Sequence, residues 1–223
     1  MIELLEYLVF GLTMLIGIFY ILFYAFKKDK ERGKLTTKLF IISIVITVPT
    51  TFFEIVVLSY GKFPNILKAL YQAFVLGFIE EFIKRYVLIN LTYKRHRHGP
   101  YPGLGYALVV ASGFATGENI LYFLDYESYD LPLLRVTLAS CGHLTFAIIM
   151  GLLLTIAKHA KRGFTKRYYF VMSLVVSLIL HSIFDYLIFL NNYILLPVYL
   201  IVILIIYIIY LKKYRLYTTY LVD

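Results

Sequence analysis

The chain has 223 residues, of which 61% are hydrophobic and only 16% are charged. A water-soluble domain of this length could not hide that much apolar surface, so the composition indicates that lipid surrounds most of it. The net charge of +9 does not predict a nucleic-acid partner, because basic loops in a membrane protein are first of all topology signals. The single cysteine, Cys141, excludes an intramolecular disulfide.

Apolar runs follow one another along the whole chain, each near the ~20 residues that a bilayer core requires. We predict helices at 6–26, 38–59, 66–91, 103–124, 133–157, 168–190 and 193–211. The first run has an acidic start and no small-residue cleavage site, which favours a retained helix over a signal peptide. The sequence therefore predicts an all-α, multi-pass transmembrane bundle of about seven helices in the cell membrane, with residues 1–223 as a single membrane domain.

The loops predict how this bundle is oriented. Basic residues gather in the segments 27–34, 94–97, 158–167 and 212–215, whereas the other loops are sparse in charge or acidic. With seven helices, every basic segment falls on the same side of the membrane. The N-terminus is then outside and the C-terminus in the cytosol.

Four consecutive predicted helices carry polar groups within their apolar runs. Such groups cost several kcal/mol each in a bilayer, so they are functional candidates that should face the bundle interior. They are Glu80, Glu81, Lys84 and Arg85; Glu118 and Asn119; His143; and His181 and Asp185. Glu80 and Lys84 are four residues apart and share a helix face, as do Glu81 and Arg85.

Small residues accompany these polar groups. Gly113 and Gly117 precede Glu118, and Ala147 and Gly151 follow His143 at intervals of four, which favours close helix packing. The ~1.5 Å rise per residue places Glu118, His143 and His181 about 10–15 Å, and Glu80 roughly 20 Å, from the outer helix ends. We expect these residues to meet between the outer half and the middle of the membrane, within a catalytic four-helix core at 66–190.

Two kinds of hydrolytic chemistry suit such a centre. Neighbouring carboxylates and a histidine can deprotonate a water and later protonate an amine leaving group. A second histidine or an asparagine amide can stabilise the oxyanion that forms on an attacked carbonyl. Alternatively, the two histidines and the carboxylates are ligands of a catalytic zinc ion, which needs three protein ligands and a water.

In order along the chain, these motifs resemble the PrsW family of intramembrane proteases, which is related to the CAAX prenyl proteases. The matching elements are Glu80-Glu81-x-x-Lys84, Phe114-x-x-x-Glu118-Asn119, His143 with Gly151, and His181-x-x-x-Asp185. The resemblance covers residues 80–185. It departs from the CAAX prenyl proteases at Glu118, where those enzymes have a histidine, and this disfavours prenyl-cysteine substrates.

The resemblance implies an intramembrane endopeptidase that makes the first cut in a membrane-anchored anti-sigma factor or a similar single-span protein. It assigns catalysis to Glu80, Glu81 and His181, with Glu118 and His143 completing the catalytic set. Lys84, Asn119 and Asp185 are the supporting residues. We expect a metal-free mechanism with no cofactor, in which glutamate and histidine activate the water; the alternative is a zinc ion.

Other interpretations of the same residues remain open at this point. A proton- or ion-coupled transporter would use the buried acids and histidines, although no inverted repeat is visible. Asn119 is equally suited to bridging helices. Cys141 and His143 are two positions apart on a helix and point in different directions, which argues against a cysteine nucleophile. Glu54 lies near the outer end of its predicted helix, where we expect it at the membrane interface.

Overall fold

The structure is a computed structural model that describes residues 30–59, 65–95, 101–125, 133–192 and 194–220. These residues form α-helices joined by short turns, with no strand among them. The elements are α2 (Lys30–Leu58), α3 (Asn65–Leu88), the π-helical turn η1 (Ile89–Tyr93), α4 (Gly103–Asp125), α5 (Leu133–His159), α6 (Gly163–Phe189) and α7 (Leu195–Tyr220). The all-α prediction is confirmed. The predicted helix at 6–26 lies outside the described residues, so the count of seven stays a prediction.

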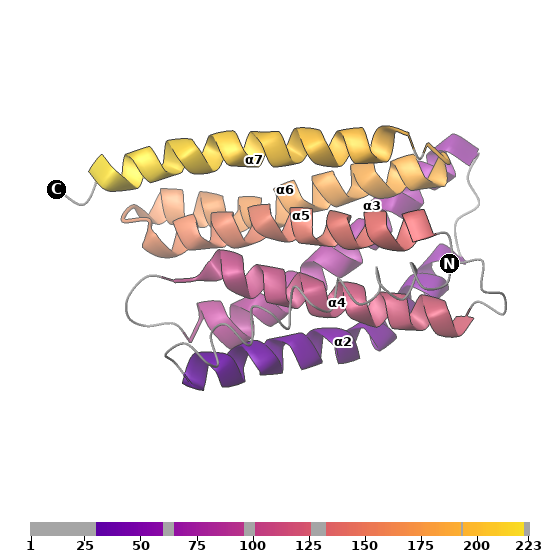
Figure 1. The fold of residues 1–223 in the computed structure, drawn as a ribbon, viewed down its shortest axis with the longest axis horizontal. Coiled ribbons are helices and arrows are strands. Elements are labelled where there is room, and N and C mark those ends of the chain that lie inside the picture. The colour runs from indigo at the N-terminus through magenta and orange to yellow at the C-terminus, as the bar shows by residue number, and fades with distance from the viewer. Residues whose placement is uncertain (1–29, 60–64, 96–100, 126–132, 193, 221–223) are drawn as a thin grey trace.

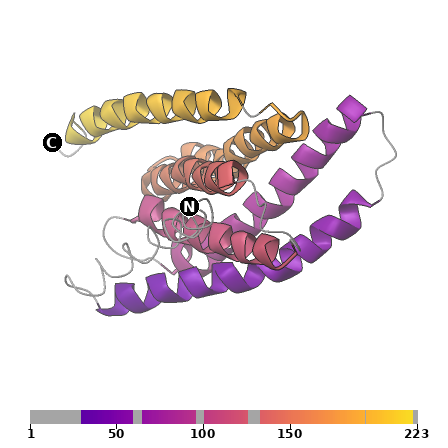
Figure 2. The same cartoon turned by 45° about the vertical axis from the view of Figure 1, so that its right-hand side comes forward.

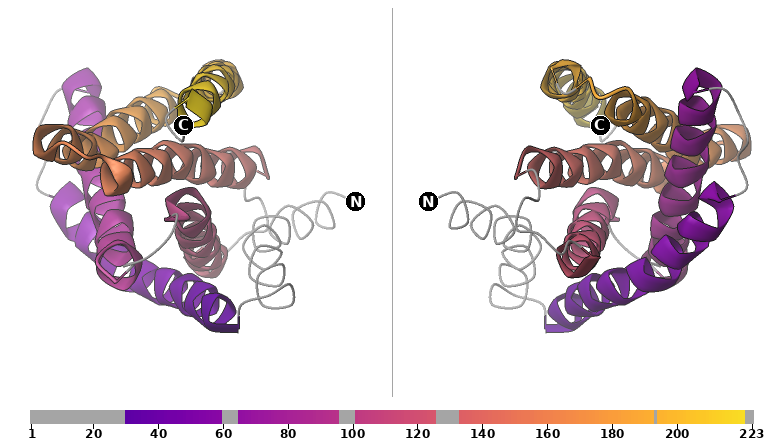
Figure 3. Two further views of the ribbon diagram at one scale, coloured as in Figure 1. Left: turned by 90° about the vertical axis from the view of Figure 1, so that its left-hand side faces the viewer. Right: turned by 90° about the vertical axis from the view of Figure 1, so that its right-hand side faces the viewer.

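Five of the helices form a closed ring. Helix α2 packs against α4, α4 against α5, α5 against α6, α6 against α3, and α3 returns to α2. Figure 1 shows the elongated bundle from the side, and Figure 2 shows how α2 and α3 run along one flank of it. Helix α7 lies outside the ring against α5 and α6, as the end views of Figure 3 also show. The polar motifs predicted at 66–190 therefore lie on four helices of one ring.

The outer surface of the ring is apolar, as expected for a surface in contact with lipid. Within the described residues, three stretches are long and apolar enough to cross a membrane: Lys30–Leu58, Leu138–His159 and Gly163–Phe189. Large apolar side chains such as Phe53 on α2 and Ile201 on α7 are more than half exposed, which water would not favour but lipid tails do. The protein is therefore a multi-pass membrane protein.

The basic segments gather at one end of the bundle. Helix α2 begins, α5 passes into α6, and α7 ends at the left side of Figure 1. Arg32, Lys161 and Lys166 belong to these segments. This geometry agrees with the predicted grouping of the basic loops.

Small residues let the ring helices approach closely, as predicted. A Cβ atom placed on Gly113 would lie 2.5 Å from the main-chain oxygen of Phe40 on α2. On Gly151 it would lie 2.6 Å from the main-chain oxygen of Gly103 on α4. The α2–α4 and α4–α5 contacts are therefore main chain against main chain, with no room for a side chain.

The helix ends differ from those predicted. Hydropathy indicates which residues lie in the apolar core of the bilayer, whereas the ends of a helix are set by its backbone hydrogen bonds. Helix α2 begins at Lys30 instead of 38 and α6 at Gly163 instead of 168, since a helix continues beyond the apolar core while its backbone bonds are satisfied. The predicted helix 66–91 is divided into α3 and η1. In η1 the Thr92 hydroxyl donates to the Leu88 carbonyl and also lies 2.7 Å from the Tyr101 hydroxyl.

The close contact at Gly151 yields a prediction about stability. The variant Gly151→Ala should lower the free energy of unfolding by about 1–3 kcal/mol, because the added methyl group forces α4 and α5 apart. Thermal unfolding of the purified protein in detergent measures this change. The matched control is Gly163→Ala, where an added Cβ meets nothing within 4 Å. Equal melting temperatures for the two variants would contradict the prediction.

Candidate active site

The ring encloses the predicted polar residues in its interior. Glu80, Glu81 and Lys84 come from α3, and His143 and His181 from α5 and α6; all five are at least 94% buried. Glu118 on α4 and Asp185 on α6 lie beside them, in hydrogen-bond or ion-pair contact with the two histidines. The predicted convergence of four helices on one polar centre therefore corresponds to the observed geometry.

The Lys84 ammonium lies at the middle of this cluster. Its Nζ atom is 2.6 Å from Glu81 Oε1, 3.3 Å from Glu80 Oε2 and 3.0 Å from His143 Nδ1. An ammonium has three protons to donate, so these three acceptors satisfy it completely. It also lies 4.7 Å from the centre of the Phe114 ring, on which it makes a cation–π contact.

Each histidine has one ring nitrogen held by a carboxylate. The Nδ1 atom of His181 is 2.9 Å from Glu81 Oε1, and the Nε2 atom of His143 is 2.6 Å from Glu118 Oε2. Because Lys84 has only donors, His143 Nδ1 is the acceptor in their contact, and a neutral His143 donates its Nε2–H to Glu118. The carboxylates thus fix the orientation of both rings, as the partners of metal-binding histidines commonly do.

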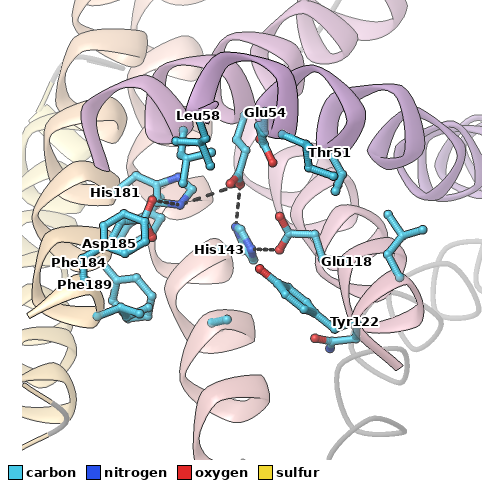
Figure 4. A pocket seen from close by; sticks show the side chains of 18 of the residues that line it. Thr51, Glu54, Leu58, Glu118, Tyr122, His143, His181, Phe184, Asp185 and Phe189 are labelled. Carbon is cyan, nitrogen blue, oxygen red and sulfur yellow. Dashed lines mark hydrogen bonds and ion pairs between the residues drawn. The ribbon is translucent and has the colours of Figure 1, made fainter. Parts of the chain in front are cut away.

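The remaining ring nitrogens both lie near the same oxygen atom. Glu80 Oε2 is 3.6 Å from His143 Nδ1 and 3.8 Å from His181 Nε2. Figure 4 draws these contacts in the centre of the site. Aromatic packing holds the rings there, since Phe146 stacks on His181 with the centres 4.8 Å apart, and the two imidazoles meet edge to face at 5.4 Å.

The three residues Glu80, His143 and His181 fit a metal ion by their chemistry and spacing. Each offers one ligand atom, and the three atoms lie within 4.8 Å of one another. Two imidazoles and one carboxylate form a common ligand set of catalytic zinc, and tetrahedral ligands at ~2.1 Å from zinc lie about 3.4 Å apart. The measured separations of 3.6 and 3.8 Å are close to this value.

Two supporting residues make the contacts that their motifs suggested. Asp185 Oδ2 lies 3.4 Å from His181 Nε2, a contact that suits a residue supporting this histidine. Asn119 Nδ2 donates to Ser140 Oγ on α5 at 3.2 Å, so it bridges helices, and it also lines the cavity described below.

Glu81 and Arg85 share a helix face, but they do not pair with each other. Arg85 Nε donates to Ser173 Oγ at 3.0 Å, and its Nη2 donates to the Phe170 carbonyl at 2.6 Å, both on α6. Glu81 instead pairs with Lys84 and His181. A side chain on a helix can reach partners both three and four positions away. Which of the two it pairs with depends on the contacts that each makes with the neighbouring helix.

A cavity of about 570 Å³ leads to the cluster. All five ring helices line it, and Glu80, Glu118, His143 and His181 are among its walls. The apolar lining residues near the helix ends, which we call the rim, are Leu58, Leu121, Leu124, Ile188 and Phe189. These rim residues lie at the C-terminal ends of α2, α4 and α6, which is the end of the bundle away from the basic segments.

Glu54 is a member of the site that sequence reasoning placed at the membrane interface. Its side chain is only 8% exposed and lines the same cavity, beside Thr51 in Figure 4. The signal that reveals it is the buried polar stripe Ser43, Thr47, Thr50 and Glu54, which follows one face of α2. The sequence prediction placed Glu54 only by its distance from the helix end and did not take this stripe into account.

The cysteine nucleophile is disfavoured by the structure as well. Cys141 is exposed, whereas His143 is 4% exposed and faces the cluster, so the two side chains leave α5 in different directions. The groups able to perform hydrolysis in the described part of the chain are therefore the carboxylates and histidines around Glu80.

Comparisons with known proteins agree with this site. Residues 31–211 match the family model described as PrsW family intramembrane metalloprotease. A protein of Clostridioides difficile (strain 630) named Protease PrsW is 30% identical over 186 residues, which cover 79% of this chain and 78% of that protein. Proteins with the same name from Oceanobacillus iheyensis and Bacillus subtilis (strain 168) are 28% and 29% identical, over 86% and 71% of this chain and 90% and 71% of their own lengths. No solved structure matches the chain significantly.

The contact between Glu118 and His143 yields a prediction about activity. The variant Glu118→Gln should lower peptidase activity about 10–100-fold, because His143 loses the carboxylate that fixes its Nδ1 toward Glu80. Cleavage of a co-expressed single-span reporter protein measures it, at matched protein levels. The control Cys141→Ala, two residues from His143, should remain fully active. Normal activity of Glu118→Gln would show that this contact does not orient the histidine.

Proposed function

We propose that this chain, which belongs to the PrsW family of intramembrane metalloproteases, cleaves a single-span membrane protein such as a membrane-anchored anti-sigma factor. Family membership makes it a peptidase of the membrane, so the enzyme class predicted from the sequence is confirmed. The transporter alternative gains no support. The substrate class comes from the resemblance of the four motifs, and the position of the cavity among the five ring helices suits cleavage inside the bilayer.

The observation that carries the proposal is the convergence of two carboxylate-held histidines on Glu80. His143 Nδ1 and His181 Nε2 lie 3.6 and 3.8 Å from its Oε2 atom, in the wall of a cavity with an apolar rim. This arrangement places the reacting groups at a cavity with largely apolar walls, which suits the entry of an apolar peptide segment. It suits hydrolysis of a peptide bond within a membrane segment.

We assign Glu80, His143 and His181 as the groups that hold a zinc ion. Of the two mechanisms left open by the sequence, the description of the family as metalloproteases favours this one over the metal-free one. When bound, a zinc ion supplies Lewis acidity, which makes a water more nucleophilic and a carbonyl more electrophilic.

The neighbouring residues position these three and balance their charge. Glu118 holds His143, and Glu81 holds His181. Lys84 donates to both Glu80 and Glu81, which holds both carboxylates in place. Asp185 faces the same nitrogen of His181 that Glu80 faces, where its carboxylate can accept a proton during hydrolysis. The core at 66–190 thus supplies all the groups assigned to the reaction.

We further infer that the cavity opens toward the outside of the cell. Its rim lies at the end of the bundle away from the basic segments, and the positive-inside rule assigns those segments to the cytosol. The substrate is then cut in the outer half of the membrane, which suits a first cut that releases an external domain. Cysteine accessibility measured from either side of intact cells tests this orientation.

Substitution of the central residues tests the proposed activity. Each of Glu80→Ala, Glu81→Ala and His181→Ala should reduce cleavage of a co-expressed single-span substrate by at least about 10³-fold, since groups that act as a unit fail together. Immunoblotting of the substrate and of the protease, at matched protease levels, measures the result. Wild-type cleavage in any of the three variants would refute the assignment of that residue.

Metal analysis tests the ligand set separately. The purified protein should carry about one zinc ion per chain, and His143→Ala should lower its zinc affinity about 10–100-fold or more. Inductively coupled plasma mass spectrometry measures the content, and a membrane-permeant chelator should abolish cleavage, with activity restored by added zinc. The control Phe82→Ala alters an exposed side chain of α3 and should keep its zinc. Full cleavage by metal-free protein would favour the glutamate-activated water instead.

A further inference from the structure

Glu54 differs from the other acids of the site in its lack of a partner. Glu80, Glu81, Glu118 and Asp185 each contact Lys84 or a histidine. Among the described residues, the Oε1 atom of Glu54 has no hydrogen-bond partner although its side chain is 92% buried, 8% of it being exposed. Buried polar groups are normally paired, because leaving one unpaired costs free energy of folding.

This side chain points into the cavity from a helix that the assigned chemistry does not use. Figure 4 shows Glu54 and Thr51 of α2 along one side of the cavity, with His143 between Glu118 and His181 below them. Glu54 is thus beside the reacting groups without being one of them. An unpaired polar group in this position is available to something that enters the cavity.

The chemistry of the rim indicates which kind of molecule enters the cavity. Leu58, Leu124 and Phe189 give this part of the cavity wall an apolar surface, which suits an apolar membrane segment far better than a charged one. Such a segment must unwind to expose a peptide bond, and its freed N–H groups then need acceptors because lipid offers none. The polar feature common to every unwound apolar segment is its main chain.

We propose that Glu54 binds the unwound main chain of the substrate, with its carboxyl group as the hydrogen-bond partner of a peptide group next to the bond that is cut. The proposal rests on the proposed function, since it concerns the same cavity and the same substrate. It makes α2 a fifth element of the site and Glu54 a substrate-binding residue. The cost of its burial is offset only when substrate is bound.

Binding and turnover of a defined probe test this role. The probe is a fluorescent single-span peptide with an uncharged membrane segment that contains a Gly-Pro pair, and the full-length protein is reconstituted in phosphatidylethanolamine–phosphatidylglycerol vesicles. Energy transfer gives the dissociation constant in a Glu80→Gln background, where turnover is stopped. Cleavage kinetics with Glu80 intact give kcat and KM. The variants are Glu54→Leu, Glu54→Gln and the lipid-facing control Phe53→Leu.

Glu54→Leu should weaken binding of the probe about tenfold or more, because it removes the hydrogen bond to the main chain. Glu54→Gln should stay within about threefold of the parent, since an amide also bonds to a peptide group. The melting temperature of Glu54→Leu should be unchanged or higher, because the variant removes an unpaired buried carboxyl group. Phe53→Leu should match the parent in all three measurements.

Three results would overturn the proposal. The first is unchanged binding by Glu54→Leu, and the second is a lowered melting temperature of that variant, which would reveal a structural role. The third is an equal loss in Glu54→Gln, which would show recognition of a positive charge rather than of the main chain. A parent protein that binds the probe but never cleaves it would refute the proposed function, while the binding data would still decide the role of Glu54.

Discussion

The constraint on which the rest of this structure depends is the burial of five carboxyl groups around a single ammonium. Glu54, Glu80, Glu118 and Asp185 line one cavity, and Glu81 is joined to them through Lys84, which contacts both Glu80 and Glu81. A bilayer does not solvate such charges, so each must be neutralised by a proton, an ammonium, an imidazolium or a metal ion. Lys84 directs two of its protons to Glu80 and Glu81 and the third to His143. The two histidines contact Glu118 and Asp185, whereas the buried Oε1 atom of Glu54 has no partner among the described residues. The acidic excess makes a divalent cation a favourable occupant.

The same contacts also hold the ring together, which links the chemistry to the fold. Glu81 meets His181 across the α3–α6 interface, and Glu118 meets His143 across the α4–α5 interface. Close approach of α4 and α5 requires Gly151, where the main chains touch. In lipid no hydrophobic force drives helices together, so close packing and interhelical hydrogen bonds must do so. The polar site is consequently part of what stabilises the bundle, and substitutions within it will affect stability as well as activity.

The sequence predicted much of this arrangement because polar residues inside apolar runs are costly and therefore informative. It identified the four helices that converge and every acid and histidine of the central cluster. It could not identify the partner of Arg85, since positions three and four apart are equivalent on one helix, and the choice depends on Ser173 of a distant helix. It also misplaced Glu54, because position along a helix was weighed without the polar face formed by Ser43, Thr47 and Thr50. Both errors concern contacts between helices. The spacing of residues along a single helix carries no information about such contacts.

Lys84 contacts residues of the proposed metal-binding set within the buried site. It donates to Glu80 and His143, two of the three residues assigned to the ion, and most closely to Glu81, which lies outside that set. An ammonium and a metal ion therefore draw on the same donors, and a lysine on a flexible four-carbon stem can give up the first two contacts while it keeps the third. Glu81 retains Lys84 beside the site and holds His181 at the same time. The adjacent Glu80 and Glu81 thus have two separate tasks that one carboxylate could not perform together. Glu80 faces the proposed reacting centre, and Glu81 holds the Lys84 ammonium and the His181 ring beside it.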